Sequence, residues 1–523
     1  MAGAFSLPNE YWLSLQVTPQ DVENLNTFLF ERETPLTTRD LSVEFVNARV
    51  KAERIAAESK QKAAGKSFLP REKYHVGDEL VFPAVARKQG KIVAIRAGVN
   101  PSLSDFDVIS VAMDDGSERM FAANFEPHAL NEVPTSVPES DEMNPASILR
   151  EYSDLIEKKM EAAFSADEGL VQIAGRWFPR ALLIDINQGQ LNLAEAVLDM
   201  SGGEPLPTET LMKDIELPAG VNPRLAEFSL NYALQNDERF DEVGPAGKVL
   251  WCLYRLEPDY VREVPSPLRY IEIEHDRHNL SPAMKNLEAQ LDDELTPSEE
   301  NGSRDDVSFV TIALIYPHLR AGTLPISAPT RKLFPTAYES SRVRFMLVDG
   351  KTKQYIPAWA VLKYGYVYGL REWYKLHRLI PGSLVQVQRG ENPGEVIVEV
   401  KNQRSSKDWV RTVMVGTDGG FVFAMLKQTI TAEFNDRMAI HVPDFKSLDP
   451  VWEKKRSFED LVLLIMRELT KSSPQGHVHA QELYAAVNLV RRVPPAPIFA
   501  LLATNPIFKH VGDLHFRLDE EMP

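Results

Sequence analysis

Residues 35–41 read Pro-Leu-Thr-Thr-Arg-Asp-Leu, and residues 205–211 read Pro-Leu-Pro-Thr-Glu-Thr-Leu, so both match P-L-x-T-x-x-L. A looser third copy keeps the two apolar positions, at Val478 and Leu483. Threonine and proline before apolar positions spaced along one helical face are typical of a helix start. A phrase that recurs along the chain predicts a fold built from repeated small units.

A second phrase, L-x-x-[DN]-x-x-F-x-x-V-G, follows two of these copies. It runs from Leu234 to Gly244 and again from Leu502 to Gly512. We expect Phe508 and Val511 to fill the core beneath a β-hairpin, with Gly512 allowing its turn because glycine tolerates positive φ. The phrases therefore predict helices followed by a small hairpin.

The repeated unit resembles a winged helix. Its last copy resembles the HARE-type winged helix of the bacterial RNA polymerase delta subunit and of chromatin-associated proteins, on Leu483-Tyr484, Asn505-Pro506, Phe508 and the Val511-Gly512 turn. This resemblance covers roughly the last 65 residues, with a weaker copy at 191–256. It implies transcription-related binding to DNA or to RNA polymerase.

Between the first two copies of the phrase, the sequence has the pattern of short β-strands separated by turns. Residues 76–82 (V-G-D-E-L-V-F) lead into a strand, 90–93 read G-K-I-V, and 114–117 read D-D-G-S, a hairpin turn. The V-G-D-x-[LV]-V-F and G-K-I-V segments resemble chromo/Tudor-like small barrels. We therefore expect a small β-barrel, of a kind that binds peptides or nucleic acid or braces a neighbouring domain.

Composition limits the class of protein. The chain has 523 residues, 44% of them hydrophobic, and a formal charge of −17, so its whole surface is not a polyanion binder. One cysteine, in an apolar run, excludes an internal disulfide, and we expect Cys252 to be buried. No signal peptide or membrane-spanning run is indicated, which favours a cytoplasmic protein.

The charge is uneven along the chain. Residues 323–411 carry 15 Lys or Arg against 7 Asp or Glu, whereas residues 452–523 carry 9 of each sign. A basic module on an acidic chain indicates a localised phosphate-binding face, although chance unevenness and a solvated basic face remain alternatives.

The basic module also resembles a plant-type DNA-binding pseudobarrel, through the Leu324-Pro325-Ile326 strand, Gly369-Leu370 with Trp373, and Pro381-Gly382-Ser383. It departs from that pattern at Ser383, where the family has aspartate. The resemblance implies duplex DNA as the partner, with affinity dominated by phosphate contacts. The candidate DNA-binding residues are Arg331, Lys332, Arg342, Arg344, Lys351 and Lys353. The aromatic residues at 364–374 are interpreted mainly as core.

A nuclease is the enzymatic alternative. Glu399 and Lys401 form an E-x-K pair on an apolar strand, as in restriction-type nucleases, where acidic groups bind magnesium and the lysine helps to activate water. Asp349 is far away in sequence. The pairs His275 and His278, and His477 and His479, lack further nearby ligands and are interpreted as ordinary histidines.

The sequence thus predicts a multidomain α+β protein with winged-helix units, a small β-barrel and a β-pseudobarrel domain. The expected regions are a winged-helix-like unit at 1–66, a small β-barrel at 70–135, a winged-helix unit with an N-terminal helix at 147–270, an acidic mobile linker at 271–307, a basic β-barrel domain at 308–450 and a HARE-like winged helix at 452–523. The favoured function is a non-enzymatic DNA-binding or transcription-associated factor. A protein-only scaffold, for example one associated with RNA polymerase, is the rival. No motif predicts a cofactor, a metal site or a small-molecule substrate.

Overall fold

The structure is a computed structural model of a mixed α and β chain with several sheets. It describes residues 9–63, 66–82, 85, 88–100, 105–131, 145–215, 220–297, 308–390, 392, 394–416, 420–454 and 456–519. The chain divides into two compact units. The first comprises residues 1–184 with 222–225, and the second comprises 185–221 with 226–523.

The first unit contains a helical part with a small sheet. Its elements are α1 (Asn9–Leu13), α2 (Pro19–Arg32), β1 (Leu36–Thr37), α3 (Thr38–Ala63), α4 (Pro145–Ser165), β7 (Leu170–Ile173) and β8 (Arg176–Pro179). The strands pair in the order β1-β8-β7. Thr18 caps α2 through a capping box with Asp21, and Pro19 occupies the first helical position.

The helix α4 belongs to this first core. Its apolar face, which includes Ile156 and Phe164, packs in one cluster with Leu41, Phe45 and Trp177. The predicted boundaries at 66 and 147 were therefore wrong: 145–179 complete the fold begun by 19–63 and are not the start of the next unit. The sequence pattern of an amphipathic helix predicts an apolar face, but it does not predict which hydrophobic core that face packs against.

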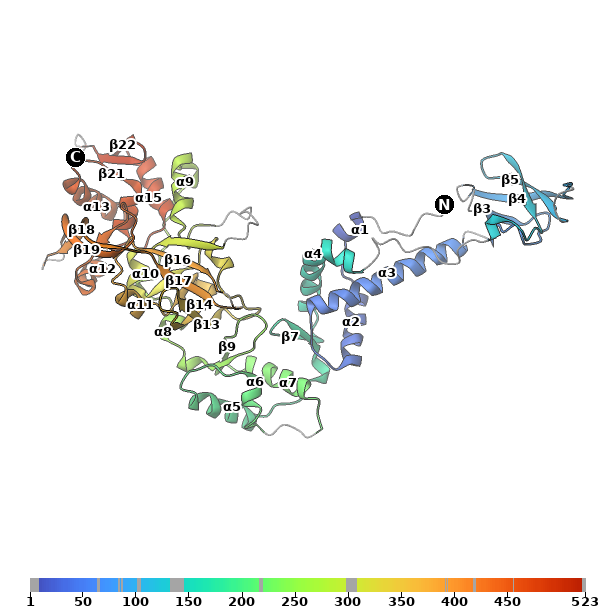
Figure 1. Cartoon of the computed structure of the whole chain (residues 1–523), viewed down its shortest axis with the longest axis horizontal. Helices are drawn as coiled ribbons and strands as arrows, with labels where there is room; N and C mark the ends of the chain where they lie inside the picture. Colours follow the sequence, from blue (N-terminus) through green and yellow to red (C-terminus); the bar gives the residue numbers. More distant parts are fainter. Residues whose placement is uncertain are drawn as a thin grey trace. The chain divides into compact units, whose positions relative to one another are not determined.

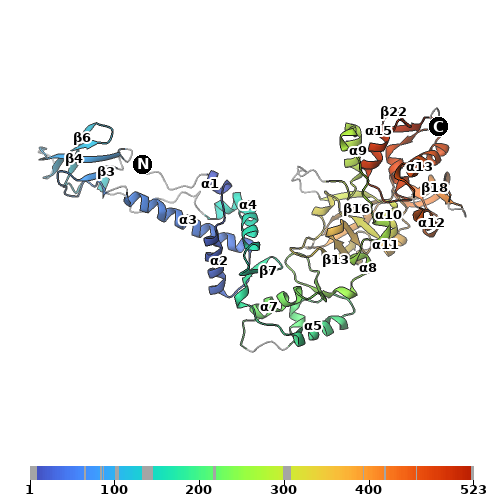
Figure 2. The same cartoon turned by 180° about the vertical axis from the view of Figure 1, so that it is seen from behind.

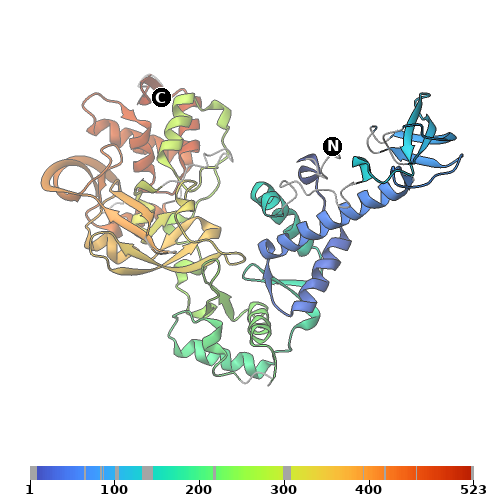
Figure 3. The same cartoon turned by 45° about the vertical axis from the view of Figure 1, so that its right-hand side comes forward.

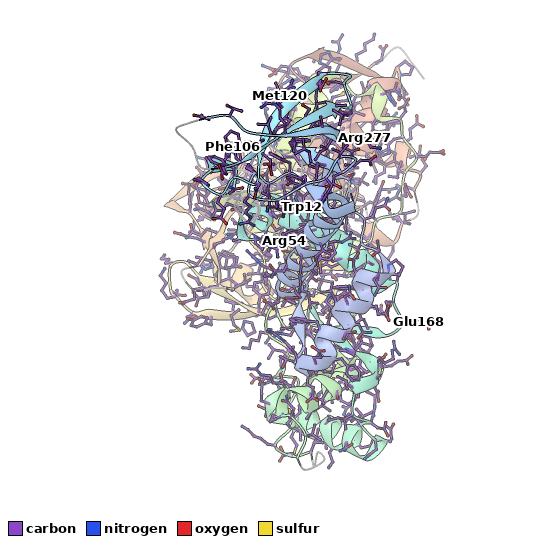
Figure 4. All side chains as sticks on the ribbon, turned by 90° about the vertical axis from the view of Figure 1, so that its right-hand side faces the viewer. Trp12, Arg54, Phe106, Met120, Glu168 and Arg277 are labelled. Atoms are coloured by element: carbon purple, nitrogen blue, oxygen red, sulfur yellow. The ribbon has the colours of Figure 1, made fainter. Side chains whose placement is uncertain are left out.

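A five-stranded sheet lies in the sequence between α3 and α4. Its strands, paired in this order, are β2 (Lys66–Ser67), β3 (Glu79–Phe82), β4 (Lys88–Ala97), β5 (Asp107–Met113) and β6 (Glu118–Ala123). Phe82, Ile92 and Val111 are buried in its own core, while Figure 4 labels Met120 on its exposed surface. The predicted strands within 76–82 and at 90–93 and the hairpin turn at 114–117 are confirmed, and closure into a barrel stays a prediction.

The second unit starts with another set of helices and short strands. Its elements are α5 (Gln188–Met200), α6 (Thr208–Leu211), α7 (Pro223–Gln235), β9 (Phe240–Glu242) and β10 (Trp251–Leu253). Leu206 makes an isolated antiparallel bridge to Trp251, which places a short strand segment before α6. Thr208 Oγ1 donates to Asn231 Oδ1 at 2.6 Å, and Trp251 Nε1 donates to the same oxygen at 2.9 Å.

The C-terminal elements repeat the same order. They are α13 (Phe458–Ser472), β21 (Val478–His479), α14 (Ala480–Val487), α15 (Pro495–Thr504), β22 (Phe508–Gly512) and β23 (His515–Leu518), with strands paired as β21-β23-β22. The hairpin is as predicted, with Phe508 buried and Gly512 at φ 117°. Val511 is 44% exposed, so its predicted core position was wrong.

The repeated phrase marks the same junction in every copy. In each, a short strand or, in the second copy, a single bridge residue is followed at once or after one residue by a helix that begins at Thr38, Thr208 or Ala480. The apolar residue three positions later is buried each time, as Leu41, Leu211 and Leu483. The residue paired with the segment is aromatic each time: Trp177, Trp251 and Phe516. The phrase therefore encodes a strand-to-helix junction and its core contacts.

A seven-stranded sheet forms the centre of the second unit (Figure 1). In pairing order its strands are β11 (Phe309–Ala313), β16 (Leu384–Arg389), β17 (Val396–Val400), β13 (Arg342–Asp349), β14 (Tyr355–Val361), β15 (Tyr366–Tyr368) and β12 (Thr323–Pro325). Its inner face packs with helices α10 (Tyr316–Ala321) and α11 (Arg371–Leu376) in one core, represented by Leu319, Leu347 and Trp373. Part of its outer face packs with residues 243–268.

A long hairpin follows the sheet and joins the C-terminal core. Its strands β18 (Asn402–Val415) and β19 (Phe421–Ala432) pair with each other and are orange in Figure 3, and β18 also pairs with β20 (Ile440–His441). Val413 and Phe423 pack in the same cluster as the C-terminal helices, and α12 (Asp449–Glu453) precedes α13. The hairpin therefore shares its core with the last repeat.

The predicted acidic linker at 271–307 is largely folded where the structure describes it. It contains α9 (Pro282–Leu291), which lies beside α15 (Figure 2), and its residues 298–307 are outside the described ranges. Arg492, fully buried, pairs with Asp293 at 2.5 Å and with Glu294 at 2.8 Å. The prediction of a mobile connection was wrong here, because the partner of its acidic residues lies about 200 positions away.

Two smaller expectations concern the membrane and the cysteine. None of the helices in the described part of the chain combines enough length with enough apolar character to cross a bilayer.

Cys252 is buried in β10, as predicted, and burial raises the pKa of its thiol to about 12.

Candidate nucleic-acid interface

Lys351 and Lys353 lie on the tight turn between β13 and β14. Asp349 holds that turn: its Oδ1 accepts the backbone N–H of Lys351 at 2.8 Å and that of Thr352 at 2.7 Å, and its carbonyl accepts the N–H of Lys353. Lys353 adopts φ 60°, a conformation that non-glycine residues rarely take. Both lysine side chains are exposed. The backbone that presents the two positive charges is therefore fixed.

The same carboxylate reaches the inner face of the sheet. Trp373 Nε1 donates to Asp349 Oδ2 at 2.6 Å, and His377 Nε2 lies 3.1 Å from that oxygen. Burial alone would raise the pKa of Asp349, but hydrogen bonds from Thr352, Trp373, His377 and Lys351 lower it to about 2. Asp349 is thus an anion that connects the turn to α11.

Further exposed cations lie on the elements that meet at Asp349. Lys375 is on α11 and Arg378 follows it. Lys401 is the first residue after β17, which runs parallel to β13 and whose Val398 carbonyl accepts the N–H of Gly350 at 2.8 Å. We call Lys351, Lys353, Lys375, Arg378 and Lys401 the basic rim. Lys375 is also paired with the exposed Glu372.

Arg331 and Lys332 lie at the other end of β17. They end a short 3₁₀ helix, Thr330–Lys332, and are exposed. The Lys332 carbonyl accepts a hydrogen bond from Arg389 Nη2 at 2.7 Å, and Arg389 pairs in register with Val396 at the start of β17. Lys332 and Arg389 line a cavity of about 530 Å³. The structure therefore separates this pair from the basic rim by the length of a strand.

Arg342 is committed to an intramolecular ion pair. Its Nη2 lies 2.6 Å from Asp241, and its Nε lies 3.4 Å from the buried Glu257. Burial, together with the neighbouring Asp241, raises the pKa of Glu257 to about 9. Arg342 joins the sheet to the segment containing β9, so we do not include it in the candidate interface.

Arg344 also makes contacts within the protein. Its guanidinium lies 5.4 Å from the ring centroid of Trp359, and its backbone N–H donates to the Val243 carbonyl at 2.7 Å. Burial lowers the pKa of its side chain. We therefore remove Arg344 from the candidate interface as well. Charge counts along a sequence cannot distinguish a buried arginine from an exposed one.

Some aromatic residues of the seven-stranded sheet and its helices are buried and others are exposed. Tyr366, Trp373 and Tyr374 are buried, which confirms their interpretation as core. Two exposed aromatic side chains were not singled out from the sequence: Phe309, 51% exposed on β11, and Tyr355, 60% exposed on β14. The alternation of side chains along the strand could have identified Phe309. Val310 and Ile312 face the core, so Phe309 and Thr311 face the other side of the sheet.

The geometry does not assemble the nuclease site. Asp349 pairs in register with Val398, and both face the inner side of the sheet. Glu399 is the next residue of β17, so it faces the outer side. Within the described ranges, no three His, Cys, Asp or Glu side chains are arranged to hold a metal ion. The upstream acid and the E-x-K pair thus lie on opposite faces.

The third helix of each repeat offers little positive charge. The sequence of α15 is PAPIFALLAT, without a charged residue, and most of that helix is buried. Helix α4 carries three basic and four acidic side chains, and α7 carries one of each. Basic side chains are therefore concentrated on the seven-stranded sheet and not on these helices.

The chain was compared with known proteins in three ways. A scan of protein-family models, a search of curated proteins and a search of solved structures each gave no match.

Proposed function

We propose that this protein is a non-enzymatic, transcription-associated DNA-binding factor that contacts the phosphates of duplex DNA through its basic rim. The observation that carries the proposal is the turn bearing Lys351 and Lys353, which Asp349 fixes by hydrogen bonds to two of its backbone N–H groups. A fixed turn presents its charges with little loss of backbone entropy on binding. Arg331 and Lys332 are proposed as a second, separate phosphate contact.

The three repeated sets of elements are proposed to be winged helices, of which the last is HARE-like. Their shared element order and the strand order in which the short segment pairs with the last strand support this assignment. The third helices have no basic face, so we assign these units to protein contacts and to support of the sheet. The five-stranded sheet and the seven-stranded sheet are proposed as the chromo/Tudor-like barrel and the pseudobarrel, respectively.

Fluorescence anisotropy with a labelled duplex of mixed sequence tests the proposal at low salt. The double variant Lys351→Glu and Lys353→Glu is expected to bind about 10-fold or more weakly, since phosphate contacts dominate such affinity. The matched control is Lys213→Glu with Lys285→Glu, which reverses two exposed charges outside the seven-stranded sheet. Absence of binding by the wild type, or equal weakening by both variants, would contradict it.

A protein-only scaffold is the second candidate, favoured by exposed apolar side chains on the β18–β19 hairpin. These are Trp409, Met414, Val422, Met425 and Leu426. An exposed apolar group of this kind is typical of a protein-binding surface. Recovery of RNA polymerase from a nuclease-treated extract by the wild type, and its loss with Trp409→Ser, would support this candidate over DNA binding.

A further inference from the structure

The outer face of the seven-stranded sheet is covered over only part of its width. Trp359 and Tyr366 of that face pack in one cluster with Val243, Val261 and other residues of the preceding segment. Toward β11, β16 and β17 the outer side chains are exposed or half-buried instead. The open part therefore comprises β11, β16, β17 and the adjoining end of β14, while the outer-face Val348 at the end of β13 is itself buried.

One row of side chains crosses the open part from strand to strand. Phe309 pairs in register with Gln388, Gln388 with Ile397, Ile397 with Val348, and Val348 with Tyr355. Paired residues point to the same face of a sheet, so all five lie on the outer side. At about 4.8 Å per strand, Phe309 and Tyr355 stand about 19 Å apart, too far for one base to touch both.

The surroundings of this row combine apolar, polar and charged groups. Met346, on the same face of β13, is partly exposed. Thr311 and Gln386, in the next row, offer hydrogen-bond donors and acceptors. One cation, Lys401, follows the end of β17, whereas Arg389 pairs with the inward-facing Val396 and so lies on the inner side of the sheet.

We propose that this open face binds an unpaired stretch of DNA, with bases stacked on Phe309 and Tyr355 and phosphates directed to Lys401 and the rest of the basic rim. Bases in a duplex already stack on one another, so a flat face with separated aromatic rings suits an unpaired strand. The assignment to DNA rests on the proposed function, because the face adjoins the basic rim.

Two carboxylates on the same face limit how the strand can lie. Glu399 is on this face, and Glu395 accepts a hydrogen bond from the Tyr355 hydroxyl at 3.3 Å. Phosphates passing directly over these carboxylates would be repelled. The bases must therefore point toward the sheet and the phosphates away from it, toward the basic rim.

The test measures affinity for an oligothymidylate of about ten nucleotides, a length within the range that single-strand-binding folds cover. Tyr355→Ala and Phe309→Ala are each expected to weaken its binding by about 5- to 150-fold, the measured range for loss of one base–aromatic stack. Tyr355→Phe should bind like the wild type, since stacking needs the ring and not the hydroxyl. Trp409→Ala, which removes an aromatic ring of similar exposure from a different sheet, is the matched control.

Duplex DNA of the same length separates this inference from the proposed function. Both alanine variants should bind duplex within about twofold of the wild type, because they leave the basic rim intact. Normal duplex binding with oligothymidylate affinity insensitive to Tyr355→Ala and Phe309→Ala would overturn the inference alone. Binding of neither DNA by the wild type would overturn both, and tighter binding of oligouridylate than of oligothymidylate would overturn the assignment to DNA.

Discussion

Trp373 donates its indole N–H to Asp349 Oδ2 at 2.6 Å and thereby ties helix α11 to the end of β13. The other oxygen of the same carboxylate accepts the two backbone N–H groups that shape the turn bearing Lys351 and Lys353. The buried Asp349 therefore fixes the backbone of the turn that carries the exposed Lys351 and Lys353. The positions of these two cations of the basic rim depend on that buried carboxylate.

Replacing Asp349 with asparagine should destabilise the protein by about 2 kcal/mol at neutral pH, because the charged acceptor lost here has a pKa of about 2 instead of its usual value near 4. The folded state holds this group ionised, so its contribution is present above about pH 4 and is lost as the pH falls toward 2. Urea unfolding at pH 7 and pH 3 measures both effects. The exposed Asp436→Asn is the control, and equal stability of the two variants at pH 7 would contradict the expectation.

Replacing Arg342 with glutamine should cost about 2 kcal/mol of stability, since it leaves the largely buried Asp241 carboxylate without its cation. Chemical unfolding should show this loss, whereas Arg331→Gln, at an exposed position, should stay within about 0.5 kcal/mol of the wild type. The folded Arg342→Gln protein should retain its duplex affinity. A variant of normal stability that fails to bind DNA would restore Arg342 to the interface.

Replacing Arg492 with methionine should cost about 3–5 kcal/mol, because the buried carboxylates of Asp293 and Glu294 would lose the guanidinium that compensates their charge, although Tyr484 still donates to Asp293 and His318 still contacts Glu294. The segment around α9 should also become sensitive to limited proteolysis. Adding Asp293→Asn and Glu294→Gln should recover part of the stability, since the uncompensated charges are then gone. The exposed Arg467→Met, on α13, should change neither property. Unaltered proteolysis in Arg492→Met would show that α9 is held by other contacts.

His479 should make the C-terminal repeat less stable in mild acid. Burial, with Arg437 nearby, lowers the pKa of its imidazole to about 4, so the unfolded chain binds the proton more readily below about pH 6.5. Stability therefore falls as the pH drops from 6.5 toward 4, by about 2 kcal/mol at pH 4.5. His479→Asn, which keeps an acceptor for the Gln481 N–H, should show a smaller fall than the wild type in urea unfolding at pH 7 and pH 4.5. The exposed His278→Asn should fall as much as the wild type does.

The repeated phrase predicted local structure well and domain extent poorly. It predicted helix starts, and helices do begin at Thr38, Thr208 and Ala480, each followed three positions later by a buried leucine. It did not predict the strand segment before each helix. It could not show that α4 completes the first repeat, since the small sheet and residues 132–144 separate that helix from α3 and the downstream phrase is missing there. Long-range packing, not local pattern, decided that assignment.

The candidate site was predictable in composition but not in detail. Clustering of Lys and Arg in residues 323–411 identified the sheet that carries the basic rim. The same count included Arg342, whose acidic partners Asp241 and Glu257 come from a different part of the chain. Asp293 was likewise expected in an acidic mobile linker, although the buried Arg492 pairs with it. In each case the deciding information was a partner distant in sequence.

The salt dependence of duplex binding tests the central claim most directly. Each phosphate contact contributes about 0.9 to the slope of log affinity against log salt concentration, so Lys351→Gln with Lys353→Gln should reduce that slope by about 2. The control pair Lys213→Gln and Lys285→Gln should leave it unchanged. A slope in the Lys351 and Lys353 variant equal to that of the wild type would show that this turn does not contact phosphate, and the account of the basic rim would be wrong.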